Sequence, residues 1–180
     1  MLNKLFYFLK RNSTILNIII LICIFILLQI VFQLLLIPNF SLVTYGDKII
    51  DFKVFYNYNE LYQSINEYSI EAYEIYNYIQ VIDLLFPLTY GLLFSLSLAR
   101  FVHRKRYYIV FFPLVGMICD YIENIGIFYM RNRHPLGYKE VSYITQFFTI
   151  SKFFFLVSSI TFIFIFIFFS YISNKKKEDI

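Results

Sequence analysis

Two long runs without a charged side chain stand out in the pattern of apolar and polar positions along the chain. The first covers residues 14–37 and the second covers residues 153–174. A helix rises about 1.5 Å per residue, so either run is long enough to cross roughly 30 Å of hydrocarbon. Both are predicted to be membrane-spanning helices, and Pro38 with Asn39 is predicted to end the first.

Two further spans reach membrane length only if they include acidic residues. The uncharged stretch 84–99 is short, so the second span must begin near residue 78 and take in Asp83. The uncharged stretch 107–119 is shorter still, and a crossing must continue through Asp120 and Glu123. The pattern therefore predicts four spans, at about residues 14–37, 78–100, 107–130 and 150–173, with an outer loop over 38–77.

Within the outer loop, apolar residues recur at alternating spacings of four and three. They are Leu61, Ile65, Tyr68, Ala72, Ile75, Ile79 and Ile82, and four glutamates fall on other faces. This period predicts an amphipathic helix that runs into the second span. A short extended piece is predicted before it, over 49–56. The fold class predicted is an all-α integral membrane protein: a four-transmembrane-helix bundle with an outer amphipathic helix preceding the second span, in one membrane domain over residues 1–180.

Composition and charge agree with this class. The chain is 59% hydrophobic and only 16% charged, with a mean hydropathy of +0.64, which excludes an ordinary soluble domain. Ten Lys and Arg residues flank one side of the predicted spans and six flank the other. The positive-inside rule then predicts a protein of the cell (inner) membrane with cytoplasmic N- and C-termini. The basic residues lie beside apolar runs, so no nucleic-acid partner is expected. The expected partner is the lipid bilayer.

The acids of the third span form the main candidate site. Asp120, Glu123 and Asn124 stand at positions i, i+3 and i+4, so they share one helix face. A carboxylate near the bilayer centre costs roughly 2.5–3.5 kcal/mol, so this face must point into the bundle. Counting along each span brings further polar groups to a similar depth. The candidate ligand-binding residues are Asp83, Asp120, Glu123, Asn124, Gln33 and Lys152, accompanied by Gln29, Tyr90 and Ser151.

Three interpretations of this cluster remain open from the sequence. The polar groups can serve only as interhelical contacts, which are worth about 0.6 kcal/mol each. They can form a functional site, in which the acids share a proton unless Lys152 or a bound cation neutralises them. The third segment can also be re-entrant or interfacial rather than spanning. For Lys152 alone, the alternative is that its ammonium reaches the headgroups.

Motifs narrow the function without identifying it. The chain has no metalloprotease, serine hydrolase, nucleotide-binding or thiol-redox motif, and no cofactor or metal is implied. His103 and His134 are predicted on opposite sides of the membrane, and the segment 131–135 is predicted to be a surface loop or to bind an acidic group. The first hypothesis is a protein that binds a cation, a proton or a lipid-like ligand. The alternatives are a membrane enzyme using acid-base chemistry on a lipid, and a structural subunit with a membrane-protein partner or a second copy.

Overall fold

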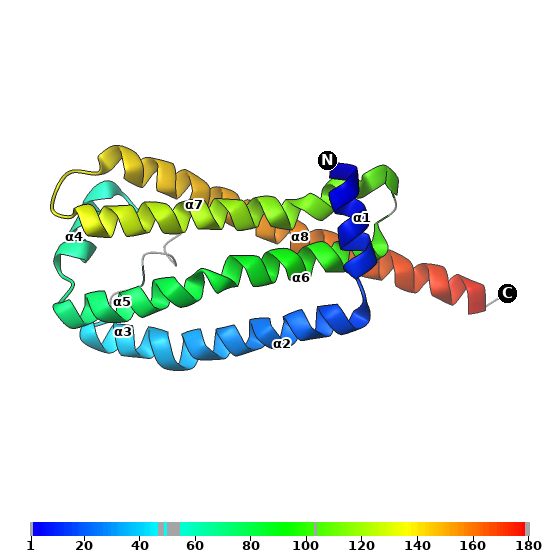
Figure 1. The fold of residues 1–180 in the computed structure, drawn as a ribbon, viewed down its shortest axis with the longest axis horizontal. Helices are drawn as coiled ribbons and strands as arrows, with labels where there is room; N and C mark the ends of the chain where they lie inside the picture. The colour runs from blue at the N-terminus through cyan, green and yellow to red at the C-terminus, as the bar shows by residue number, and fades with distance from the viewer. Residues whose placement is uncertain (1, 47–48, 50–54, 103, 179–180) are drawn as a thin grey trace.

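The protein is a bundle of long helices lying side by side (Figure 1). The computed structural model describes residues 2–46, 49, 55–102 and 104–178, and all elements within them are helical. His103 and most of the predicted extended piece, residues 50–54, lie outside the described residues. Four helices are long and apolar enough to cross a membrane: Ile15–Val43, Ile70–Phe101, Arg106–Arg133 and Lys139–Ile172.

Each long helix except the last is built from more than one segment. The first joins α2 (Ile15–Val31), a π-helical turn (Phe32–Leu36) and α3 (Ile37–Val43); the second joins α5 (Ile70–Asp83) and α6 (Leu85–Phe101); the third joins a 3₁₀ segment (Arg104–Phe111) and α7 (Phe112–Arg133); the fourth is α8 (Lys139–Glu178). Two short helices, α1 (Leu2–Asn12) and α4 (Tyr58–Asn66), lie at opposite ends of the bundle (Figure 1). These ends are called the α1 end and the α4 end below.

The sequence predicted that the first long helix ends at Pro38, but the structure shows that it does not. It continues through Pro38 to Val43. Proline lacks the N–H that would bond to the carbonyl four residues earlier, and its ring clashes with that carbonyl. The π-helical turn Phe32–Leu36 lies directly before this proline, and the Ile37 N–H bonds five residues back to the Phe32 carbonyl. The wider turn lets the helix pass the proline instead of stopping there.

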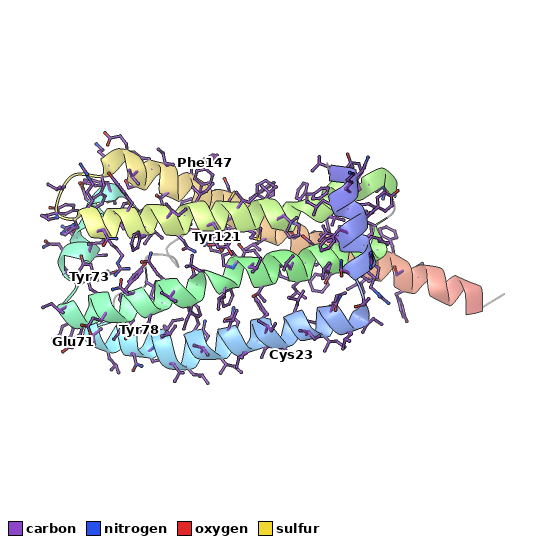
Figure 2. All side chains as sticks on the ribbon, in the orientation of Figure 1. Cys23, Glu71, Tyr73, Tyr78, Tyr121 and Phe147 are labelled. Carbon is purple, nitrogen blue, oxygen red and sulfur yellow. The ribbon has the colours of Figure 1, made fainter. Side chains whose placement is uncertain are left out.

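The second long helix is interrupted at Leu84, between α5 and α6. Three residues later, Pro87 has no N–H to offer the Asp83 carbonyl, so the regular ladder is broken at this level. The Tyr121 hydroxyl of α7 donates to the Leu84 carbonyl at 2.9 Å, and Tyr121 is labelled in Figure 2. A side chain of the neighbouring helix thus helps to satisfy backbone that the interruption exposes.

The predicted outer amphipathic helix is two helices rather than one. Helix α4 ends at Asn66 and α5 begins at Ile70, where the Ser69 hydroxyl accepts from the Ala72 N–H at 3.1 Å and caps the new helix. The predicted apolar stripe is otherwise confirmed. Its members Leu61, Ile65, Tyr68, Ala72 and Ile79 are buried, whereas the glutamates of the segment, Glu60, Glu67, Glu71 and Glu74, are exposed.

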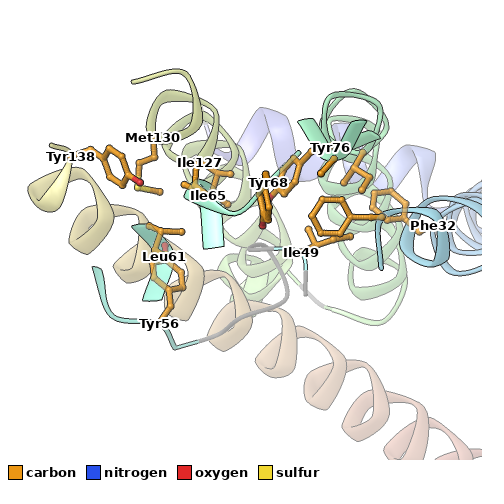
Figure 3. Close-up of a cluster of buried hydrophobic side chains, with 13 residues drawn as sticks. Phe32, Ile49, Tyr56, Leu61, Ile65, Tyr68, Tyr76, Ile127, Met130 and Tyr138 are labelled. Atoms are coloured by element: carbon orange, nitrogen blue, oxygen red, sulfur yellow. The ribbon is translucent and has the colours of Figure 1, made fainter. Parts of the chain in front are cut away.

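Two groups of buried apolar side chains hold the two ends of the bundle. At the α4 end, residues of α4 and α5 pack with Phe32, Ile127, Met130 and Tyr138 (Figure 3). At the α1 end, Phe6 and Leu9 of α1 are buried against α6 and the 3₁₀ segment. The sequence analysis did not predict α1 as a helix. Lys10 fixes it, because its ammonium donates to the Ala99 carbonyl at 2.6 Å at the end of α6.

Arg131 joins α7 to α5 at the α4 end. Its guanidinium donates to the Gln80 side-chain oxygen at 2.5 Å, to the Asn77 side-chain oxygen at 3.0 Å and to the Tyr73 carbonyl at 3.2 Å. It also lies 4.0 Å from the centre of the Tyr76 ring, a cation–π contact. Arg131 is therefore a buried part of the helix packing, and the prediction that it belongs to a surface loop is wrong.

We expect Arg131→Met to lower the free energy of unfolding by about 2 kcal/mol, because it removes three hydrogen bonds from a charged donor to partly buried groups of α5. Arg133→Met is the matched control, because Arg133 is exposed at the end of the same helix. Chemical unfolding of the two purified variants in detergent measures the difference. Equal destabilisation by both substitutions would show that the buried contacts of Arg131 do not hold α5 in place.

Candidate functional site

The polar face of α7 points into the bundle, as predicted. Asp120, Glu123 and Asn124 are exposed to only 5%, 1% and 6%. They lie between the two apolar groups that hold the ends of the bundle. Helix α7 runs without interruption from Phe112 to Arg133, so the segment does not fold back on itself as a re-entrant hairpin would.

Lys152 of α8 neutralises the two acids of α7. Its ammonium lies 2.6 Å from Glu123 Oε2 and 3.2 Å from Asp120 Oδ1. The lysine is 8% exposed, so the alternative in which it reaches outward to headgroups is wrong. One cation thus lies between two carboxylates, in the position that a bound metal ion or a shared proton would otherwise take.

The remaining carboxylate oxygens of the two acids also have partners. The Tyr90 hydroxyl of α6 donates to Asp120 Oδ2 at 2.7 Å. The Thr149 hydroxyl of α8 donates to Glu123 Oε1 at 2.8 Å. Each oxygen of Asp120 and Glu123 therefore has a donor or the ammonium within reach, which is what burial of charge requires. The cluster links α6, α7 and α8.

Asp83 and Asn124 belong to the cluster but form no ion pair with Lys152. Asp83 is half-buried at the end of α5 and interacts electrostatically with Asp120, Lys152 and Glu123, but the ion pairs of Lys152 go to the other two acids. Asn124 also lies beside Asp83. Asn124 is itself 6% exposed, and its side chain interacts with the Asp83 carboxylate. Asp83 is thus the acid of the cluster with which Lys152 forms no close ion pair.

A pocket of about 300 Å³ adjoins the cluster, between α2, α6, α7 and α8. Its polar lining is Gln29, Gln33, Asp83, Tyr90, Asp120 and Lys152; its apolar lining is Phe25, Phe32, Phe86, Phe94, Phe153, Leu156 and Ile160. Four of the six candidate ligand-binding residues, Gln33, Asp83, Asp120 and Lys152, thus line one cavity. The other two, Glu123 and Asn124, are buried in the bundle and do not line it, and Gln33 is exposed.

Both helices beside the polar part of the pocket are irregular at that level. The π-helical turn Phe32–Leu36 includes the lining residues Phe32 and Gln33. The interruption at Leu84 follows Asp83 directly. Such departures from regular helix are frequent at functional sites because they redirect side chains and free backbone groups.

The sequence analysis missed one partner in the cluster and wrongly included another. Thr149 was not predicted, although Thr145, Thr149 and Lys152 recur at spacings of four and three and so share one face of α8. Ser151 was predicted to join the cluster, but its hydroxyl donates to the Phe147 carbonyl of its own helix at 2.8 Å. Adjacent residues on a helix are about 100° apart, so Lys152 and Ser151 cannot both face the acids.

We expect Lys152→Met to lower the free energy of unfolding by about 3–5 kcal/mol, because it leaves two buried carboxylates without their counter-ion. The triple variant Lys152→Met, Asp120→Asn, Glu123→Gln should recover most of this loss, since it removes the charges together. Lys139→Met, at the exposed start of α8, is the control. Unfolding in detergent compares the three; a triple variant no more stable than the single one would refute the ion-pair account.

The site therefore combines a satisfied ion cluster with an open cavity beside it. The cluster holds three helices together, and the cavity presents part of the same polar surface, including Asp83, toward an apolar space. A polar end facing an apolar wall suits an organic ligand with both characters. Comparisons with protein families, with curated proteins and with solved structures found no match to this chain.

Proposed function

We propose that the protein is an integral membrane protein that binds an amphipathic, lipid-like ligand in the pocket between α2, α6, α7 and α8. Insertion is supported by the apolar side chains that the bundle leaves uncovered. Within the most apolar 18 residues of the first and the fourth long helices, only 11% and 6% of the residues are buried inside the bundle. Side chains such as Ile26 and Phe168, 51% and 62% exposed, need hydrocarbon as their surroundings.

The same proposal includes an orientation. The excess of Lys and Arg beside residues 1–13, 100–106 and 175–177 favours placing the α1 end on the cytoplasmic side of the cell membrane. The α4 end, with α4, the start of α5 and the turn before α8, then lies outside the cytoplasm. In this orientation the Asp83 side of the pocket lies nearer to the outer surface than its apolar part does.

The pocket is the observation that carries the ligand proposal. A cavity of about 300 Å³ is at the lower end of the range found for small organic ligands and much larger than a bare cation needs. Its walls are mainly phenylalanine, leucine and isoleucine side chains, which offer a cation few oxygen ligands. Lys152 already occupies the position between Asp120 and Glu123. A lipid-like molecule uses both the polar and the apolar lining, whereas a cation or a proton uses only the first.

The arrangement supports binding better than acid-base catalysis. A general acid or base must exchange a proton with a substrate that it touches. Asp120 and Glu123 instead direct their oxygens at Lys152, Tyr90 and Thr149. A purely structural role accounts for this ion cluster but leaves the cavity beside it without a purpose.

Filling the apolar part of the pocket tests the proposal. Leu156→Trp places an indole into the cavity, and Val157→Trp is the matched control because Val157 is 63% exposed on the adjoining face of the same helix. Both proteins are extracted in mild detergent from the membranes in which they are expressed. Native mass spectrometry then measures the fraction of protein that carries a co-purified lipid.

We expect wild type and Val157→Trp to retain a lipid adduct, and Leu156→Trp to lose about nine-tenths of it, because the wider side chain takes the space of the apolar part. A cation adduct in place of lipid would contradict the lipid-like ligand. Equal lipid retention by both variants would show that the bound lipid lies elsewhere on the bundle. No adduct on wild type would reject the binding proposal.

A further inference from the structure

We infer that the ligand carries a protonated amine at its polar end, and that Asp83 anchors this amine in the pocket. The inference rests on the proposed binding function and deepens it by naming the chemical class of the ligand: a single-chain amphipathic amine. It is drawn from the balance of charge at the site and from the position of Asp83 on the pocket wall.

The polar cluster contains more acid than base. Asp83, Asp120 and Glu123 are three carboxylates, and Lys152 is the cation that pairs with two of them. In hydrocarbon surroundings an uncompensated carboxylate is costly. A ligand with a positive charge offsets the excess, whereas an anionic ligand increases it.

Geometry separates Asp83 from the other two acids. Asp120 and Glu123 are held by Lys152, Tyr90 and Thr149 from inside the bundle. Asp83 lies at the end of α5, beside the interruption at Leu84, and lines the cavity directly. It is the carboxylate that a molecule in the cavity can reach without breaking an existing ion pair.

The surrounding groups fit an N–H donor. The side chains of Gln29 and Gln33 line the same cavity from the first long helix, and their carbonyl oxygens are acceptors. An ammonium has three donors and no acceptor, so a carboxylate with neighbouring amide carbonyls matches it. The charge of Lys152 is less available to an anionic end group, because its ammonium lies 2.6 and 3.2 Å from carboxylate oxygens.

The pocket also offers apolar lining to a hydrocarbon chain attached to such an end group. Phe25 precedes Gln29 and Gln33 by one and two turns on the first helix, and Phe94 follows Tyr90 by one turn on α6. Leu156 and Ile160 follow Lys152 by one and two turns on α8. On all three helices, apolar lining therefore continues beyond the polar groups toward the α1 end. Phe32, Phe86 and Phe153 add apolar lining among the polar groups themselves.

Three probes of equal chain length test which end group the pocket prefers: dodecylamine, dodecanol and dodecanoic acid. Each is titrated at pH 7 into the purified full-length protein in phosphatidylcholine nanodiscs, and the rise in the midpoint of thermal unfolding gives an apparent affinity. Asp83→Asn removes the charge and keeps the shape. Glu74→Gln, an exposed site on the same helix, controls for the loss of one negative charge from the protein.

We expect wild type and Glu74→Gln to bind dodecylamine about tenfold more tightly than dodecanol, the ratio given by about 1.4 kcal/mol of charge-assisted hydrogen bonding. Dodecanoic acid should bind most weakly of the three. Asp83→Asn should bind the amine no better than the alcohol. Its affinity for dodecanol should stay within about twofold of wild type, which shows that the pocket is still formed.

The remaining outcomes separate this inference from the proposed function. Preference for dodecanoic acid would identify Lys152 as the anchor and overturn the amine, while the binding function would stand. Equal binding of all three probes, or an amine preference that survives Asp83→Asn, would also overturn it. No binding of any probe, together with no lipid adduct on the purified protein, would reject the proposed function as well.

Discussion

The arrangement of this bundle depends on the pairing of Lys152 with Asp120 and Glu123. Charged side chains inside an apolar bundle are stable only when each has partners that replace water. Here the ammonium lies 2.6 Å from Glu123 and 3.2 Å from Asp120, and these contacts fix α8 against α7 in rotation and height. Small residues allow the two helices to approach closely: a Cβ on Gly126 would overlap the Thr145 side chain, and one on Gly116 would lie 3.2 Å from Phe155. The position of α8 in turn defines one wall of the pocket.

Much of the fold follows from the pattern of apolar residues, and the departures from it have local causes. The uncharged runs predicted four long helices because hydrocarbon tolerates few charges. The pattern did not predict that the first helix passes Pro38, because a π-helical turn is a response of the backbone that apolar periodicity does not record. The separation of α4 from α5 has a sequence signal in Ser69, a common N-cap residue. The regular spacing of Leu61, Ile65, Tyr68 and Ala72 concealed it.

The composition of the site was predictable to the extent that it follows from depth. Two acids on one face of the third helix have to point inward, and counting along the spans placed Asp83 and Lys152 at a similar height. Which side chains of a helix contact the acids depends instead on the rotation of that helix about its axis. The apolar pattern does not define this rotation when apolar residues lie on every face. This is why Ser151 was included and Thr149 omitted, although the two residues are close along α8. Arg131 was assigned to a surface loop because the third span was predicted to end near residue 130, whereas α7 continues to Arg133.

The cavity distinguishes the two main interpretations of buried charge at this site. A cluster that serves only to join helices is best closed, because every polar group facing an empty apolar space loses interaction energy. Replacing such a cluster with apolar side chains is often neutral or stabilising, so stability alone gives no reason to leave polar groups facing a cavity. Here Asp83, Tyr90, Asp120 and Lys152, with Gln29 and Gln33, line a pocket whose other walls are apolar. The irregular turns at Phe32–Leu36 and at Leu84 lie beside that pocket. Phe32 also packs in the apolar group at the α4 end, and the 3₁₀ segment packs against α1 at the other end. Two of the departures from regular helix therefore lie where the proposed ligand would be in contact with the chain. Together with the polar groups that face the pocket, they favour binding over packing as the proposed role of these residues.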